Sequence, residues 1–421
     1  MTARQRVVAF QGKQLSLKVG ISTGDLHETR QQQKPKGFVV RGGRMHEMHY
    51  ECYWELLSHI PSLEDPNISV RNESYEFNER FISNGQARLL KNGEKLDVSS
   101  YGLSFGQKKD FVKLTYVSEK SLGDKRIEDW FDQAFFDTKF WYIWSSMFAF
   151  QKWSSLAEMR RYMKRFMHLV DGLPRLGGVM RTKYNQYDSV VRPMKKYLEE
   201  KGVAFGNPGP FCNNIDLQKW YSFTATMKDN TFLDYMENFS GNVDGTGGLV
   251  TLTDSNWLMS IVIARQPHFP QQADDVAIFW GYGLYPDRKG NYIDKTMAEC
   301  TGAEMLEELY YHLKIQDLMK PVTEAGKVNC IPVAMPFIDS LFMPRTLGDR
   351  PDVIPEGSTN FAFLGQFAEA PKDCVFTVEY SVRTAQMAVY GLFDTDKKVH
   401  PMYESTHNPQ YLLAALKAIS R

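Results

Sequence analysis

The chain has no excess of charge of either sign and no long apolar run. Its 50 lysines and arginines match its 50 aspartates and glutamates, so we expect no nucleic-acid partner. The most apolar stretch, Phe140 to Phe150, is too short to span a bilayer, which takes roughly 20 apolar residues. The N-terminal residues lack the apolar segment of a signal peptide. These absences predict a soluble, cytoplasmic protein.

The sequence is also poor in cysteine. His46, His49 and Glu51 stand close together without the HExxH spacing, so we expect no metal. Apolar and aromatic residues, by contrast, make up 43% and 13% of the chain, enough for a large core in two or three domains. The five cysteines form no CxxC pair, which argues against a disulfide framework and a zinc site: Cys52, Cys212, Cys300, Cys330 and Cys374.

Helix signals begin only after a polar N-terminal segment. Residues 1–35 have no regular pattern and are expected to be poorly ordered. We predict a helix over 46–59 and two long helices over 140–168. The second of these two would be capped by Ser155, with Glu158 at capping-box spacing.

A β-rich region and further helices follow. We expect Asp124 to cap a helix that carries Ile127, Trp130 and Phe131 on one face. Thr301 with Glu304, and Asn408 with Pro409, are spaced as helix starts. The predicted strands are 249–253 and 257–263, which form a hairpin, with 276–285 and 361–365; the predicted helices end at 313, 392 and 419.

Two glycine-containing turns could approach a ligand. GQFAE at 365–369 follows a strand and precedes a helix, so backbone N–H groups and the positive end of a helix dipole would meet at the carboxyl end of that strand. RGGR at 41–44 combines glycines, which let the backbone come close, with arginines that pair with phosphate or carboxylate. The alternatives are an ordinary loop and a basic surface turn.

Long motifs resemble the oleate hydratase family, also called myosin-cross-reactive antigens. That resemblance implies an FAD-dependent carbon–oxygen hydro-lyase that adds water to the cis-9 double bond of a fatty acid such as oleate or linoleate and gives a 10-hydroxy acid. The motifs are RGGR, MFAFQKW from Met147, KYNQYDS from Lys183, FWGYGLYPDRKGNYIDK from Phe279 and NFAFLGQFAEAPKDC from Asn360.

The implied fold is α/β plus helical: an FAD-binding domain of the two-dinucleotide-binding-domain flavoprotein type, with a fatty-acid-binding domain. The FAD-binding domain would be incomplete, since no GxGxxG set precedes RGGR and DGTGG at 244–248 leads into a strand. Residues 202–212 join two pieces that the family separates by a longer stretch. A truncated or mis-spliced gene model would produce such a junction. We expect remnants of the FAD-binding domain at 36–60 and 321–400. The substrate-binding region would be 61–320, helical over 120–200 and β-rich over 215–290, and 401–421 would hold a C-terminal helix.

The resemblance also assigns roles to single residues. Tyr162 matches the tyrosine that protonates the alkene, and Arg161 and Arg165 would help to lower its pKa; the alternative is a tyrosine that merely packs between them. Met45 stands where the family usually has the glutamate that activates water. Glu47 or His46 could replace that glutamate. The expected FAD contacts are Arg41, Gly42, Gly43, Arg44, Gly365, Gln366, Phe367, Phe376 and Thr377.

Gln186 and His268 match residues that hold the fatty-acid carboxylate, with Arg265 as an alternative partner. Val262 and Ala264 replace a threonine and an asparagine of the family at this place. Two other functions stay open: a non-catalytic fatty-acid-binding relative, and a flavin-dependent isomerase or oxidoreductase. A transient membrane contact and a homodimer also stay open. FAD itself is expected to bind weakly, because the glycine loop that seats its pyrophosphate is missing.

Overall fold

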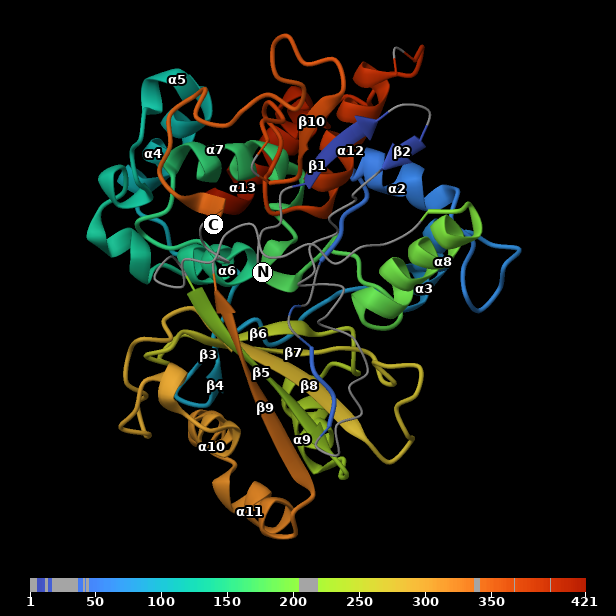
Figure 1. Cartoon of the computed structure of the whole chain (residues 1–421). Helices are drawn as coiled ribbons and strands as arrows, with labels where there is room; N and C mark the ends of the chain where they lie inside the picture. The colour runs from blue at the N-terminus through green and yellow to red at the C-terminus, as the bar shows by residue number, and fades with distance from the viewer. Residues whose placement is uncertain are drawn as a thin grey trace.

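A computed structural model describes most of the chain as a mixed α/β protein. The described residues are 6–11, 14–16, 37–40, 42, 45–203, 219–336, 341–366, 368–393 and 395–421, with the backbone alone for 6–16 and 219. A large sheet with helices below it forms one half, and a mainly helical layer forms the other (Figure 1).

The large sheet has seven strands in the order β4-β3-β6-β7-β8-β5-β9, and all neighbours are antiparallel except β3 and β6. The predicted hairpin is confirmed as β6 and β7. The strands are β3 (Leu89–Lys91), β4 (Glu94–Lys95), β5 (Lys219–Met227), β6 (Gly248–Leu252), β7 (Met259–Ile263), β8 (Ala277–Gly283) and β9 (Val328–Pro336).

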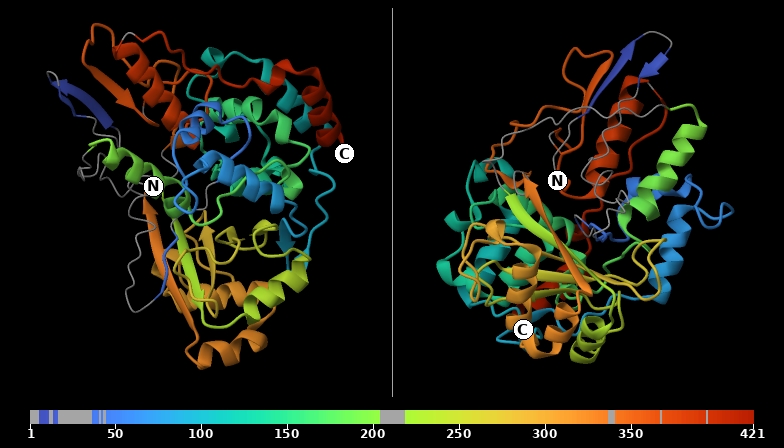
Figure 2. Two further views of the ribbon diagram at one scale, coloured as in Figure 1. Left: turned by 90° about the vertical axis from the view of Figure 1, so that its right-hand side faces the viewer. Right: turned by 60° about the horizontal axis from the view of Figure 1, so that its bottom comes forward.

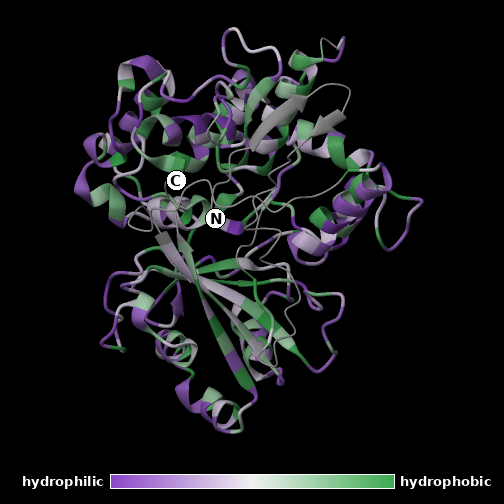
Figure 3. Cartoon of the chain, in the orientation of Figure 1, coloured by the Kyte–Doolittle hydropathy of each residue, from purple (hydrophilic) through white to green (hydrophobic). Residues whose placement is uncertain are grey.

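The two faces of this sheet bury different cores because side chains alternate along each strand. Phe223 and Phe279 point to the face covered by α9 (Thr231–Ser240), α10 (Gly302–Leu313) and α11 (Gln316–Glu324). Trp220, Trp280 and Tyr282 point to the other face, toward the helical layer. Hydrophobic residues are frequent in these strands, whereas the outer loops are largely hydrophilic (Figure 3).

The helical layer confirms most of the predicted helix starts. Ser155 and Asn408 accept backbone N–H groups at the starts of their helices in this layer. On the other face of the large sheet, Thr301 forms the predicted capping box with Glu304 in α10. The helices of this layer are α2 (Glu51–Ser58), α3 (Val70–Arg80), α4 (Phe105–Tyr116), α5 (Glu119–Leu122), α6 (Lys139–Phe148), α7 (Leu156–Arg165), α8 (Arg192–Glu200), α12 (Val378–Leu392) and α13 (Pro409–Ser420).

Two helix predictions need correction. Asp124 caps no helix; a 3-10 turn at Ile127–Asp129 follows Arg126, whose backbone N–H donates to Asp129. The helix predicted from His46 begins only at Glu51, because His46 pairs through its backbone with Met180 in an isolated bridge. Arg126 also forms an isolated bridge with Ser155, so both chain segments are held by contacts distant in sequence that local patterns do not reveal.

A second, small sheet lies at the far end of the helical layer from α9, α10 and α11 (Figure 2). It has the order β10-β1-β2, is antiparallel throughout, and comprises β1 (Arg6–Gln11), β2 (Gln14–Ser16) and β10 (Phe361–Leu364). Strand β9 falls in the segment 321–400 that was expected to serve FAD, but it pairs with β5 in the large sheet. No helix in the described part is both long and apolar enough to cross a bilayer.

Candidate active site

Two adjoining cavities lie between the large sheet and the helical layer. The larger has about 980 Å³ of space free of protein atoms, part of it open to solvent, and Glu47, Tyr162 and Phe376 line it. The smaller has about 750 Å³ on the same measure, and Gln186 and His268 line it. Four residues line both cavities: Gly42, Met45, Val262 and Trp280. The structure thus brings the expected proton donor and the expected carboxylate partners to neighbouring spaces, with Met45 between them.

Tyr162 is fully buried on α7 and its hydroxyl has a defined partner. The backbone N–H of Phe376 donates to the Tyr162 oxygen at 2.8 Å. The phenol therefore accepts this bond and keeps its own proton to give. Aromatic rings surround it, with ring centroids 5.2 Å to 5.7 Å away: Phe148, Phe150, Phe166 and Phe342.

The expected lowering of the Tyr162 pKa is wrong. Burial raises the pKa of Tyr162 well above its ordinary value, and Cys374 and Glu158 raise it further. Arg161 and Arg165 do not oppose this, because carboxylates neutralise both of them. Arg161 lies 2.7 Å from Glu119 and 2.8 Å from Glu369, and Arg165 lies 3.0 Å from Glu47. Tyr162 is consequently a protonated phenol in a largely apolar wall, the state required of an acid.

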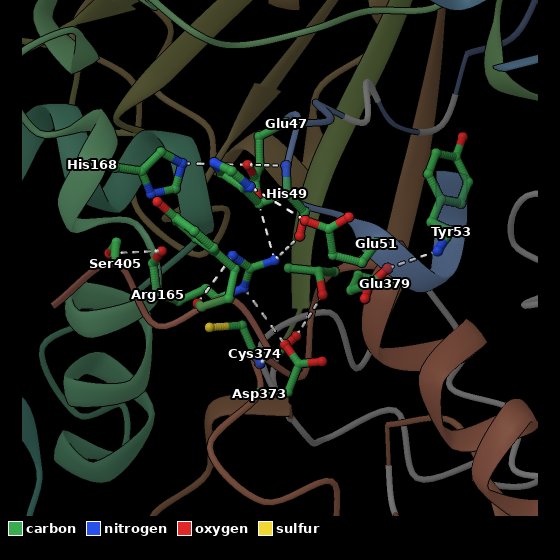
Figure 4. Close-up of polar contacts among 12 residues, drawn as sticks. Glu47, His49, Glu51, Tyr53, Arg165, His168, Asp373, Cys374, Glu379 and Ser405 are labelled. Atoms are coloured by element: carbon green, nitrogen blue, oxygen red, sulfur yellow. Dashed lines mark hydrogen bonds and ion pairs between the residues drawn. The ribbon is translucent and has the colours of Figure 1, made fainter. Parts of the chain in front are cut away.

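Glu47 is a buried carboxylate with three polar contacts (Figure 4). It lies 3.0 Å from Arg165 and 3.3 Å from Nε2 of His168, and it accepts the backbone N–H of His49 at 2.7 Å. Burial alone would raise the pKa of Glu47, but the hydrogen bond to His168 and the charges of Arg165 and His168 lower it below its usual value. Glu47 is therefore ionised and fixed in orientation at the wall of the larger cavity.

Arg165 connects this carboxylate to a longer chain of charges. Asp373 lies 4.0 Å from Arg165 and 2.7 Å from Arg383, and Arg383 lies 2.7 Å from Glu379. Glu379 in turn accepts the backbone N–H groups of Cys52 and Tyr53 at the start of α2. The chain of ion pairs holds the segment after Met45 against α7 and α12.

The two histidines near Met45 lie in different surroundings. His46 packs among Tyr50, Tyr53 and Trp54, whereas His49 stacks on Tyr403 with ring centroids 3.5 Å apart. Within the described ranges, no three His, Cys, Asp or Glu side chains are grouped so that they could hold a metal ion.

The residues expected to bind the carboxylate line the smaller cavity, but they differ in whether their side chains already have a polar partner. His268 has a buried Nδ1 without a hydrogen-bond partner in the part of the chain described, and burial lowers its pKa to about 4, so the ring is neutral. Arg265 is already paired with Asp244 and stacks over Phe81 at 4.8 Å. Val262 and Ala264 line this cavity too, and both are apolar.

One charged residue of this cavity was missed by the sequence analysis. Arg181 lines the smaller cavity, and its Nε and Nη2 are buried without a hydrogen-bond partner among the described residues. The only sequence signal was its position two residues before KYNQYDS. Charge and sequence position alone do not show whether an arginine is exposed or buried.

The residues expected to contact FAD are only partly assembled at the cavity. Gly42, Phe376 and Thr377 line the larger cavity, and no atom of the other described residues lies within 4 Å of where a side chain on Gly42 would begin. Gly365 and Gln366 follow β10 and do not line either cavity as described. Arg41, Gly43, Arg44 and Phe367 lie outside the described residues.

Of the residues expected to contact the flavin, the described ones thus bring three to the larger cavity, and the described residues show no seat for a pyrophosphate. Gly365 has a positive φ of 79° and open space beside it, but its N–H donates to Thr384 at 2.9 Å. Thr377 caps α12 by accepting the N–H of Tyr380. The strand next to β10 is the antiparallel β1, whereas the usual dinucleotide site lies in a parallel sheet.

Comparisons with known proteins show which sequences this chain is similar to. The MCRA family model matches residues 18–205 and 203–390. The chain is 37% identical over 474 residues to an oleate hydratase of Streptococcus pyogenes serotype M49 (strain NZ131), which covers 90% of this chain and 80% of that protein. It is 29% identical over 500 residues to a linoleate hydratase of Lactiplantibacillus plantarum, which covers 90% of this chain and 87% of that protein.

The comparisons also bear on the expected internal junction. The two segments that match the family model meet at residues 203–205, within the junction placed at 202–212. Both pairwise alignments are longer than the 421 residues of the chain. Each relative therefore has residues without a counterpart here.

Proposed function

This chain belongs to the MCRA family, and from that premise we propose that it is a fatty acid hydratase of the oleate hydratase type. The reaction adds the elements of water across a cis double bond of an unsaturated fatty acid such as oleate or linoleate. One observation supports it above all: Tyr162, a buried phenol that accepts a hydrogen bond, lies at the wall of a cavity that adjoins a second one lined in part by polar side chains.

The substrate would run through both cavities. Its carboxylate would lie among the polar residues of the smaller cavity, including Gln186 and His268. Its double bond would lie beyond Met45, in the larger cavity whose wall is mostly aromatic and aliphatic. A long apolar chain with one charged end suits such a path, because burial of each CH₂ contributes about 0.8 kcal/mol.

Tyr162 would act as the general acid. Its O–H proton goes to one alkene carbon, and the oxygen of a water molecule bonds to the other carbon. The proton that this water loses returns to the phenolate through an acceptor, so the net change is addition of one H and one OH. The N–H of Phe376 helps by donating to the phenolate oxygen as its charge develops.

Glu47 is our proposed acceptor for the proton of water. It is ionised and lines the same cavity, whereas Met45, at the place of the usual glutamate, has no group that takes a proton. Its contacts with Arg165 and His168 lower its basicity but fix its orientation. A positioned weak base can still orient water for attack.

FAD is the cofactor we propose, with Gly42, Phe376 and Thr377 as contacts on the side of the larger cavity. Hydration is redox-neutral, so a bound flavin would organise the site without carrying electrons. Thr377 begins α12, whose N-terminal N–H groups and dipole favour negative charge.

Met45 favours one second candidate, a relative that binds fatty acids without hydrating them. To distinguish the two candidates, purified protein is incubated with FAD and oleate, and the extracted acids are analysed by mass spectrometry. A 10-hydroxy acid formed by the parent and not by Tyr162→Phe supports the hydratase. Oleate binding without any hydroxy acid, in protein shown to hold FAD, would select the binding protein.

A further inference from the structure

The guanidinium of Arg181 lacks, among the described residues, the partners that the guanidinium groups of Arg88, Arg165 and Arg383 have. Its Nε and Nη2 are buried without a hydrogen-bond partner among the described residues, and no nearby charge affects its pKa, which burial alone lowers to about 10. Burying a charge without a partner is costly, and such a group is normally paired or bound to a ligand.

Arg88 shows the contrast. It is also buried, but it donates to the Thr251 hydroxyl at 2.8 Å, to the Ser146 hydroxyl at 2.8 Å and to the Ile143 carbonyl at 3.0 Å. Arg165 and Arg383 are buried with carboxylates within 3.0 Å. Among these four arginines, Arg181 alone has no acceptor for its guanidinium in the described part of the chain, so burial by itself does not explain the absence.

The surroundings hold Arg181 at the cavity wall. Its backbone N–H donates to the Asn78 side chain at 2.8 Å, and its carbonyl accepts from the same side chain at 2.7 Å. A side chain on Gly248 would overlap the guanidinium, so this glycine leaves the space that Nη2 occupies. Asn78 and Gly248 come from α3 and β6, which are far apart in sequence.

We propose that Arg181 binds the carboxylate of the fatty acid in the smaller cavity, an inference that rests on the proposed function. Gln186 and His268 line the same cavity and would contribute neutral hydrogen bonds beside the charged one. A guanidinium can donate two parallel bonds to one carboxylate, which fixes both its position and its direction.

This assignment accounts for the apolar residues at Val262 and Ala264. The two side chains line the smaller cavity and offer no hydrogen bond to a head group. Arg265, the other arginine there, already forms an ion pair with Asp244. Arg181 is thus the cationic side chain of this cavity without an acidic partner among the described residues.

The test compares two ligands that differ only in the head group, oleate and oleyl alcohol, by titration calorimetry with purified protein. In the parent we expect oleate to bind more tightly than the alcohol. In Arg181→Met we expect the Kd for oleate to rise about 10- to 100-fold, as for loss of a charged hydrogen bond, while the Kd for the alcohol changes little. The Kd of Arg181→Lys for oleate should fall between those of the parent and of Arg181→Met, since lysine keeps the charge but cannot donate the second parallel bond.

Arg175, exposed and six residues earlier in the chain, provides the matched control Arg175→Met, which should leave both Kd values unchanged. Melting temperatures without ligand give an independent readout. A buried arginine kept for a ligand should be replaceable by methionine without loss of stability, whereas a structural arginine should not. Equal oleate affinity in Arg181→Met and the parent would overturn the assignment of Arg181 alone. Failure of the parent to bind oleate would instead overturn the proposed function.

Discussion

The hydroxyl oxygen of Tyr162 accepts the backbone N–H of Phe376 at 2.8 Å, which joins the expected proton donor on α7 to a residue two positions before α12. The bond fixes the phenol at the cavity wall and leaves its proton free to be donated. It also places an expected flavin contact directly beside the acid.

From this bond we predict that Tyr162→Phe abolishes nearly all turnover while oleate still binds. General acid catalysis contributes on the order of 10² to 10⁴ in rate, and phenylalanine has no proton to give. The variant also removes the hydrogen bond that the half-buried Phe376 N–H donates, which costs about 0.5 to 1.5 kcal/mol of stability. Turnover should be measured alongside oleate affinity and melting temperature. A rate within a few-fold of the parent would refute the role of Tyr162.

We predict that Met45→Glu raises hydratase activity in protein that holds FAD. Met45 lines both cavities, so a carboxylate there would reach water near the double bond. Met45→Gln is the control, because an amide has similar size and polarity but is not a base. A gain with glutamate and none with glutamine is the expected pattern in rate assays. No gain in FAD-loaded protein would mean that another residue orients the water.

We predict that the protein loses stability at alkaline pH, because His312 on α10 loses its proton there. Its side chain is 1% exposed, with Asp254 at 3.6 Å and Glu308 at 3.4 Å. Although burial lowers its pKa, these two carboxylates raise it to about 8. Since the folded-state pKa is above the unfolded value near 6.5, the stabilisation is complete below pH 6.5 and is lost as pH rises through about 8.

The shift corresponds to at most about 2 kcal/mol. Melting curves of the parent at pH 6 and pH 9 should show the lower melting temperature at pH 9. In His312→Gln, which cannot be charged, this difference should shrink. A parent that melts at the same temperature at both values would contradict the prediction.

We predict that FAD binds this chain more weakly than micromolar. Dinucleotide sites neutralise or hydrogen-bond two phosphates, usually at a glycine turn that opens a helix. The described residues include two of the proposed flavin contacts, Gly42 and Thr377, but no such turn. Calorimetric titration of the purified protein with FAD measures this directly. Affinity of micromolar or better would show that the remaining residues suffice for the whole cofactor.

Local patterns in the sequence predicted much of the fold. The caps at Ser155, Thr301 and Asn408 depend on residues three or fewer positions away, and all three were found. The hairpin of β6 and β7 likewise follows from two runs rich in apolar residues on either side of a turn. Such features can be predicted because the interacting groups are neighbours in the chain.

What the sequence did not predict depends on contacts between distant segments. The start of α2 is fixed by Glu379 of α12, which binds the N–H groups of Cys52 and Tyr53 across more than 300 residues. The ion pair between Arg165 and Glu47 also joins residues more than 100 positions apart. Because it neutralises Arg165, the expected lowering of the Tyr162 pKa does not occur. The unpaired Arg181 is another case, since its burial results from α3 and β6.

The most direct test of hydratase function is isotopic analysis of the product. Purified protein, supplied with FAD and oleate, should be incubated in water enriched in ¹⁸O and, separately, in D₂O, and the extracted acids analysed by mass spectrometry. We predict a hydroxy fatty acid that carries one ¹⁸O atom in the first case and, in the second, one deuterium on the carbon next to the hydroxyl-bearing carbon. Unchanged oleate in protein shown to hold FAD, or a product with no oxygen from water, would contradict the account.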